Sequence, residues 1–210
     1  MEPQSVSNLP EGHPAQAAEP TESVLIARAQ GGDLAAFDQL VLRHQQTVFA
    51  VAVRMLGDPD EAQDVAQDAF VRAFRAITTF RREAKLSTWL VSITMNLCRN
   101  RRRWWARRRR VIVASLDDPV ETEEGTIERE VADPAPSPAA DAERREQGAR
   151  LSAALQLLSD AERSIIVLRD LQGCSYGEIA EMLHCRVGTV KSRLSRARLQ
   201  LRALLDGAAG

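Results

Sequence analysis

Two stretches of this chain concentrate side chains that bind phosphate, and the first is Arg99–Arg110, RNRRRWWARRRR. Eight of its twelve residues are arginine, a density that neutralises nucleic-acid phosphates and predicts strongly salt-dependent binding. Trp104 and Trp105 lie inside the stretch, and aromatic rings among arginines can stack on unpaired bases. In the alternative interpretation, one or both tryptophans pack on a helical bundle and the arginines form a solvated tail.

The second stretch is a basic helix predicted over about 187–205, with apolar residues at alternating steps of four and three. A helix of this width fits the major groove of DNA, where residues near its start reach base edges. The candidates for base or phosphate contacts are Lys191, Ser192, Arg193 and Arg196. Thr189 is a candidate for binding a phosphate near the helix start. A solvated basic helix that closes a small bundle is the alternative.

A basic loop and an acidic helix face complete the set of candidate binding features. The loop 79–86, TFRREAKL, carries Arg81, Arg82 and Lys85 between two apolar helices, a natural place for a base pocket. The acidic edge carries Asp64 and Asp68 one helical turn apart. Because this edge repels DNA, it faces either solvent or a basic protein partner, and the charge pattern alone favours solvent.

Side chains for enzymatic catalysis or metal binding are not found in a recognised arrangement. The chain has no Ser/His/Asp set, phosphate-binding glycine loop or paired metal motif, so we expect neither an enzyme nor a cofactor. Its three cysteines are widely spaced, which excludes a disulfide framework, fits a reducing cytoplasm and favours idle thiols over a zinc site. The scattered residues are His13, His44, His184, Cys98, Cys174 and Cys185.

Composition and charge indicate how the chain is divided. Of its 210 residues 44% are hydrophobic and only 4% aromatic, which suits small helical domains. Residues 1–22 hold 0 basic and 4 acidic residues, and 23–115 hold 16 and 8. Residues 116–149 hold 3 basic and 11 acidic residues, and 150–210 hold 9 and 6. Two basic blocks separated by an acidic one predict two polyanion-binding modules and a linker.

Helix start and stop signals divide both basic blocks into helices. In the first, Asp33 caps a helix that Gly57 ends, Asp58 and Pro59 open the next, and Ser87 is a candidate cap for the last. In the second, capping boxes begin at Ser159 and Ser175, and a tight turn precedes the basic helix. A short helix, a turn and a longer basic helix are typical of a helix-turn-helix.

These signals predict an all-α protein of two small helical domains joined by a flexible, acidic, proline-rich linker. Residues 1–22 are expected to be disordered, because they are rich in Pro, Glu, Ser and Ala. The domains are expected at 23–110 and 146–210, with the linker at 111–145. We expect neither a secretory signal nor membrane insertion, since no sufficiently long apolar run exists.

Together these segments resemble the extracytoplasmic-function (ECF) sigma factors of the bacterial sigma-70 family. The first block carries the resemblance in GDPDEAQDVAQDAFVRAFRAITTF and STWLVSITMNLCRNRRR, and the second in LSDAERSIIVLRDLQGCSYGEIAEMLHCRVGTVKSRLSRARLQL. The second motif alone is shared with other helix-turn-helix domains, whereas the first is more specific. The likeness covers about 23–110 and 150–205.

The resemblance implies a cytoplasmic protein that binds core RNA polymerase, directs it to promoters, promotes DNA melting and is controlled by an anti-sigma factor. It places Asp64, Gln67 and Asp68 on the polymerase, whose beta-prime clamp and beta subunits are the implied partners. It assigns the minus-ten element to Phe80, Arg81, Arg82, Lys85, Ser87, Trp89, Asn96, Arg99 and Arg103. It assigns the minus-thirty-five element to Arg186, Thr189, Lys191, Ser192, Arg193 and Arg196.

The chain departs from the family pattern in two places that bear on promoter preference, and it differs in its linker and its N-terminus as well. Asn100 stands where many relatives have Asp, and the Trp104–Trp105 pair is unusual. The acidic linker is long for the group, and the N-terminal extension is additional. The alternative function is a helix-turn-helix regulator that binds duplex DNA without polymerase.

Overall fold

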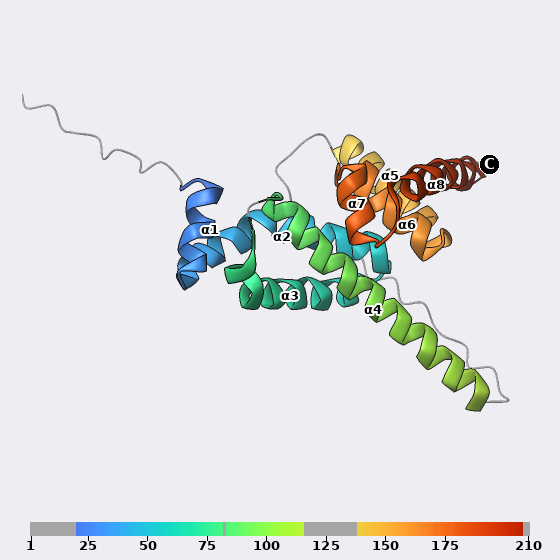
Figure 1. The fold of residues 1–210 in the computed structure, drawn as a ribbon. Coiled ribbons are helices and arrows are strands. Elements are labelled where there is room, and N and C mark those ends of the chain that lie inside the picture. The colour runs from blue at the N-terminus through green and yellow to red at the C-terminus, as the bar shows by residue number, and fades with distance from the viewer. Residues whose placement is uncertain (1–19, 82, 116–137, 208–210) are drawn as a thin grey trace, which may run out of the picture.

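The computed structural model describes residues 20–81, 83–115 and 138–207, and over these ranges the chain forms helices and no strands. The all-α prediction is therefore confirmed. The first domain contains α1 (Glu22–Gln30), α2 (Leu34–Leu56), α3 (Pro59–Ala76), the 3₁₀ turn η1 (Ile77–Thr79) and α4 (Leu86–Ser115) (Figure 1). The second contains α5 (Pro138–Leu157), α6 (Asp160–Ile166), the π-helical turn η2 (Val167–Leu171), α7 (Tyr176–Met182) and α8 (Val187–Gly207).

The helix boundaries of the first domain follow from local side-chain chemistry. The Asp33 carboxylate accepts a hydrogen bond from the Ala36 backbone N–H and caps α2, which ends at Gly57 with a left-handed φ of 79°. The Asp58 carboxylate caps α3, and Pro59 occupies its first turn. These predicted signals are confirmed. The helix α4 begins at Leu86, so Ser87 lies inside its first turn and the prediction of Ser87 as its cap is wrong.

The first domain is built around α2, which contacts α1, α3 and α4. Its apolar face is fully buried at Val48, Val51 and Met55. The helix α1 was not predicted from the sequence, although Leu25, Ile26 and Ala29 give it a buried apolar face. At its end, the Gln30 amide donates hydrogen bonds to the carbonyls of Ile77 and Phe80, 47 and 50 residues away. The helix α1 therefore holds the start of the loop that leads into α4.

The second domain confirms the predicted helix-turn-helix. Both capping boxes are formed: the Ser159 and Ser175 hydroxyls accept from the N–H groups of Glu162 and Glu178, whose carboxylates accept from the serine N–H groups. Between α7 and α8 the chain turns at His184, whose φ of 50° is left-handed. The helix α8 buries Val190, Leu194 and Ala197 against its neighbours α6 and α7.

Replacing Ser175 with alanine is expected to lower the free energy of unfolding by about 1 kcal/mol at pH 7, because one end of α7 loses its cap. Hydrogen bonds from the Ser175 backbone and hydroxyl, and then from Thr88, lower the pKa of Glu178 below its ordinary value of 4.5. A carboxylate with a lowered pKa contributes stability above about pH 4.5 and loses it as the pH falls through the folded-state pKa. Urea unfolding measures the stability loss of Ser175→Ala at pH 7, and a comparison of pH 7 with pH 3 measures the contribution of the Glu178 carboxylate.

The matched control for this pH effect is Glu181→Gln, at an exposed position of the same helix. Glu178→Gln should lower stability relative to wild type at pH 7 and converge with it at pH 3, whereas Glu181→Gln should follow the wild-type pH dependence. A constant difference between Glu178→Gln and wild type across this range would contradict the role given to the capping box.

The helices extend into the range predicted as a linker. The helix α4 runs for 30 residues to Ser115, and α5 begins at Pro138, so parts of 111–145 are helical. Residues 1–19 and 116–137 lie outside the described residues, so the predictions of disorder at the N-terminus and of a flexible linker there stay predictions.

The two domains meet at an interdomain joint formed by Arg102, Gln156, Asp160 and Arg163 around the C-terminal end of α2. Arg163 is completely buried, and it donates four hydrogen bonds to the backbone carbonyls of Met55 (2.8 Å), Leu155, Gln156 and Leu158. Arg102 also donates to the Met55 carbonyl (3.1 Å) and pairs with Asp160 (2.6 Å).

The joint satisfies carbonyls that a helix end leaves free. Gln156 donates to the Arg54 carbonyl at 3.0 Å, and a Cβ at Gly57 would lie 2.7 Å from its side chain. Arg54 and Met55 belong to the last turn of α2, whose carbonyls have no partner within the helix. The second domain therefore caps a helix of the first.

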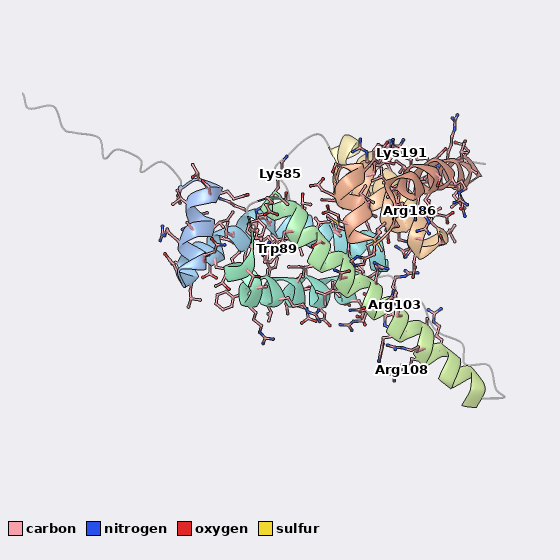
Figure 2. All side chains as sticks on the ribbon, in the orientation of Figure 1. Lys85, Trp89, Arg103, Arg108, Arg186 and Lys191 are labelled. Atoms are coloured by element: carbon pink, nitrogen blue, oxygen red, sulfur yellow. The ribbon has the colours of Figure 1, made fainter. Side chains whose placement is uncertain are left out.

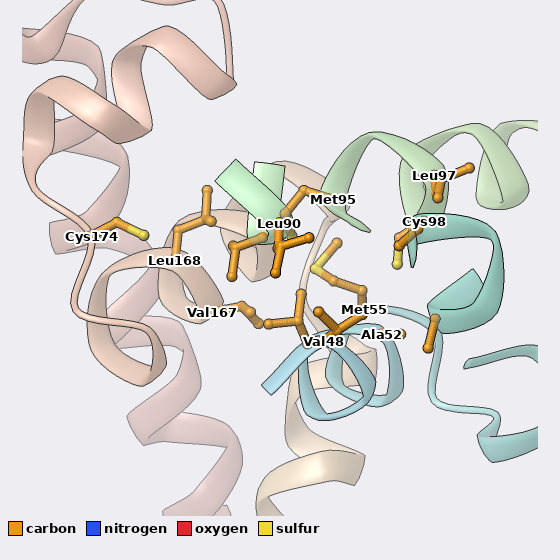
Figure 3. Close-up of a cluster of buried hydrophobic side chains, with 14 of the residues drawn as sticks. Val48, Ala52, Met55, Leu90, Met95, Leu97, Cys98, Val167, Leu168 and Cys174 are labelled. Atoms are coloured by element: carbon orange, nitrogen blue, oxygen red, sulfur yellow. The ribbon is translucent and has the colours of Figure 1, made fainter. Parts of the chain in front are cut away.

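The hydrophobic core continues across the joint. Figure 3 shows Val167 and Leu168 of η2 in one cluster with Val48 of α2 and Leu90 of α4, and these four residues are at most 3% exposed. Among the helices that the structure describes, none combines the length and the hydrophobicity that a membrane crossing requires.

Candidate nucleic-acid interface

The loop before α4 starts from a fixed aromatic anchor. Phe80 is buried, and its ring packs against Trp89 with the ring centroids 5.0 Å apart. The side chains of Arg81 and Lys85 are exposed, and Lys85 projects from the loop at the start of α4 (Figure 2). Two basic side chains of the predicted minus-ten loop therefore extend into solvent, next to the packed rings of Phe80 and Trp89. Arg82 lies outside the described residues.

One stripe of α4 collects predicted minus-ten residues. Trp89, Asn96, Arg99 and Arg103 follow one another at steps of seven, three and four, which places them along one side of a helix. Asn96 and Arg103 are exposed, whereas Trp89 and Arg99 are half-buried. Ser87 is half-buried in the first turn, and its position in the helical repeat is off this stripe. The stripe can contact a nucleic-acid strand along several turns.

The arginine-rich stretch divides between structural and solvent-facing residues. Arg101 pairs with Glu61 at 2.7 Å, and Arg102 belongs to the interdomain joint. Trp105 packs against the core, whereas Trp104 is 44% exposed and has the Arg108 guanidinium 5.1 Å from its ring centroid. Trp105 thus packs on the bundle, as the alternative interpretation expects, whereas Trp104 is open to solvent and its stacking on bases stays a prediction.

The predicted minus-thirty-five residues lie at the start and on the outside of α8. The Arg186 carbonyl accepts the backbone N–H groups of Thr189 and Val190 and so begins the helix. Arg186, Lys191, Ser192 and Arg196 have exposed side chains, and Thr189 and Arg193 are half-buried. Figure 2 shows Arg186 and Lys191 on the second domain.

The flank of α8 that faces α7 is organised around Tyr176. The Lys191 ammonium lies 5.7 Å and the Arg169 guanidinium 4.7 Å from the centre of this ring. Arg198 forms two hydrogen bonds with the Asp170 carboxylate and is therefore held by its own domain. The ring of Tyr176 therefore orients Lys191. Arg198 is occupied by Asp170 and is less available to a ligand.

The acidic face of α3 borders a groove in the first domain. Asp64, Gln67 and Asp68 are all exposed, and their spacing of three and four places them on one helix face. Gln67 lines a groove of about 410 Å³ between α2 and α3, together with Phe49 and Phe70. The structure brings together the three residues that the resemblance places on the polymerase, with apolar and amide groups beside two carboxylates.

The three cysteines are free thiols, and two of them are buried. Cys98 is completely buried, and burial raises the pKa of its thiol to about 12. Burial also raises the pKa of Cys174, and Cys185 is half-buried. Within the residues that the structure describes, no three His, Cys, Asp or Glu side chains form a group that could hold a metal ion. The Cys98 and Cys174 thiols are therefore poor nucleophiles at neutral pH.

Comparison with known families and proteins assigns both domains. Residues 40–110 match Sigma-70 region 2, and residues 148–201 match Sigma-70 region 4. The chain is 36% identical over 174 residues to the RNA polymerase sigma-H factor of Pseudomonas aeruginosa, covering 83% of this chain and 88% of the relative. It is 34% identical over 183 residues to the ECF RNA polymerase sigma-E factor of Escherichia coli K12, covering 85% and 91%.

Solved structures give the same assignment. CnrH in complex with the cytosolic domain of CnrY matches with a TM-score of 0.60 and 30% identity, over 89% of this chain and 97% of that one. The sigma factor RpoE of Bartonella quintana, in complex with the anti-sigma factor NepR, matches with a TM-score of 0.60 and 29% identity, over 81% and 96%. The chain therefore belongs to the extracytoplasmic-function sigma factors of the sigma-70 family.

Proposed function

We propose that this protein binds core RNA polymerase in the cytoplasm, directs it to specific promoters and promotes DNA melting, and that it is not an enzyme. The observation that carries the proposal is the presence of two solvent-facing basic helices, α4 and α8, on the two sigma-70 domains of one chain. Relatives that match most of this chain are named RNA polymerase sigma factors.

The two domains divide promoter recognition between them. The first reads the minus-ten element with the basic loop before α4 and with the stripe Trp89–Asn96–Arg99–Arg103. The second reads the minus-thirty-five element as duplex with Arg186 and the outer face of α8, because an α-helix fits the major groove. Unstacking a base costs a few kcal/mol, so a chain with few aromatic residues relies on polymerase for part of the melting energy.

Control by an anti-sigma factor is part of the proposal. Two neighbours of similar fold were solved with a bound second protein, the cytosolic domain of CnrY in one and the anti-sigma factor NepR in the other. Each match covers more than four fifths of this chain and therefore extends over both domains. We expect a regulator of this chain to occlude both domains.

Transcription with purified core polymerase tests the proposal directly. The chain should form a complex with the polymerase and start transcripts at discrete genomic sites, whereas core polymerase alone should not. The alternative, a regulator that binds duplex DNA without polymerase, predicts tight specific DNA binding by the isolated chain and no polymerase complex. That second result would overturn the proposal.

The polymerase is proposed to bind the acidic face of α3. Reversing two charges in Asp64→Lys/Asp68→Lys should weaken the complex with core polymerase by at least about tenfold, since like charges placed in an interface cost several kcal/mol. Both side chains are exposed, so the fold should not change. Fluorescence anisotropy of the labelled chain titrated with core polymerase measures the effect.

The control for this variant is Asp38→Lys, an equally exposed acidic position on α2. This control should bind polymerase like wild type. Equal binding by the Asp64/Asp68 variant and wild type would show that the polymerase uses another surface.

A further inference from the structure

The helix α4 is longer than the domain that supports it. Trp105 is the last of its side chains known to pack against the core, and the helix continues to Ser115. Figure 1 shows this segment extending away from the other helices. We call residues 106–115 the distal arm. At 1.5 Å per residue the arm is about 15 Å long, which matches roughly four phosphates of one DNA strand at 3.4 Å each.

Within the residues that the structure describes, no carboxylate pairs with the arginines of the distal arm. Arg107, Arg108 and Arg109 are exposed, and none of them forms an ion pair with another described residue. Earlier in the same helix, Arg101 and Arg102 are both paired with carboxylates. Arg107, Arg108 and Arg109 thus present positive charge to solvent, where it attracts a polyanion.

The arm also continues the stripe of α4 that is proposed to contact the minus-ten element. Arg99, Arg103 and Arg107 follow at steps of four, so they share one side of the helix. Arg108 lies against the exposed ring of Trp104, which limits its freedom and reduces the entropy that a contact must offset. A strand that follows the stripe past Arg103 meets these charges next.

We propose that the distal arm is a third DNA contact, which binds backbone phosphates of the promoter duplex between the minus-ten and minus-thirty-five elements. The proposal rests on the proposed function. It places the duplex there because Arg107 continues the stripe of α4 beyond Arg103, the last residue proposed to contact the minus-ten element. Such contacts add affinity and salt dependence without sequence preference.

The test compares Arg107→Gln/Arg108→Gln with wild type in complexes of the full chain with core polymerase. The matched control is Arg72→Gln/Arg75→Gln, which removes two exposed arginines from α3. Two DNA fragments are used: the minus-ten element with the intervening duplex, and the minus-ten element with that duplex removed. Dissociation constants are measured between 50 and 200 mM salt, and binding of each variant to core polymerase is measured without DNA.

On the longer fragment the arm variant should bind more weakly, and its slope of log K against log salt should be shallower by about 1.8 for two lost phosphate contacts. Over this range of salt the wild type should then lose about tenfold more affinity than the variant. On the shorter fragment the two should agree, and the control should follow wild type on both.

Three results would overturn the arm's role. Equal binding of the arm variant and wild type to the longer fragment would show that the arm does not contact DNA. An equal loss of affinity on both fragments would place the contact at the minus-ten element. A loss of affinity for polymerase without DNA would assign the arm to an acidic protein surface. Failure of the wild-type chain to form any promoter complex would instead contradict the proposed function, and the arm's role with it.

Discussion

Replacing Arg163 with alanine is expected to lower the free energy of unfolding by about 3–5 kcal/mol, the largest effect of any single substitution considered for this protein. Arg163 is completely buried, and its guanidinium donates to four backbone carbonyls. Burial lowers its pKa only to about 10, so the group stays charged at neutral pH. Truncation leaves buried carbonyls without a donor and opens a cavity in the interdomain joint.

Equilibrium urea unfolding, followed by circular dichroism, measures this loss. Arg163→Lys keeps the charge but lacks the planar fork, so it should retain only part of the stability. Arg150→Ala, at an exposed position on α5, is the control and should stay within about 0.5 kcal/mol of wild type. A loss below about 1 kcal/mol for Arg163→Ala would mean that the joint does not depend on this side chain.

Replacing Arg196 with alanine is expected to weaken binding of the polymerase complex to promoters with a minus-thirty-five element by about 1–3 kcal/mol, or roughly 5- to 150-fold. Val190, Leu194 and Ala197 form the buried stripe of α8, and the helical repeat places Arg196 on the opposite side. Its side chain is exposed and free to reach base edges, whereas Arg198 is held by Asp170.

Promoter fragments with an intact or a scrambled minus-thirty-five element provide the measurement. The loss should appear with the intact element and largely disappear with the scrambled one, since base contacts carry sequence information and phosphate contacts do not. Arg202→Ala removes an exposed arginine further along the same helix and should cause a smaller loss. An equal loss on both fragments would make Arg196 a phosphate contact.

Local signals predicted the helix boundaries that depend on neighbouring residues. Asp33, Gly57, Ser159 and Ser175 act through hydrogen bonds or backbone angles within a few positions, and the structure confirms each of them. The helix-turn-helix followed from two such boundaries and one apolar stripe. The prediction of Ser87 as a cap failed because α4 starts at Leu86, two residues before the start that a cap at Ser87 would give.

The parts that the sequence did not predict depend on contacts between distant residues. In the sequence Arg163 is one more charged residue of a capped helix, and nothing there indicates its contact with Met55, 108 residues away. The two tryptophans of α4 cannot be told apart by type, since their exposure depends on where the first domain ends beneath them. The role of Gln30 could not be predicted either, because its amide binds backbone carbonyls, which every residue has, at distant positions before α4.

The hydrogen bond from Arg163 to Met55 has a consequence for how tightly any partner can hold the two domains apart. Breaking this one charged hydrogen bond costs about 1–3 kcal/mol. Taken alone, this cost limits molecules with separated domains to roughly 1 in 5 to 1 in 150 of the population. The apparent dissociation constant of such a partner rises by the same factor over its intrinsic value. A substitution that loosens the contact without unfolding either half would thus tighten that association while making the chain itself less stable.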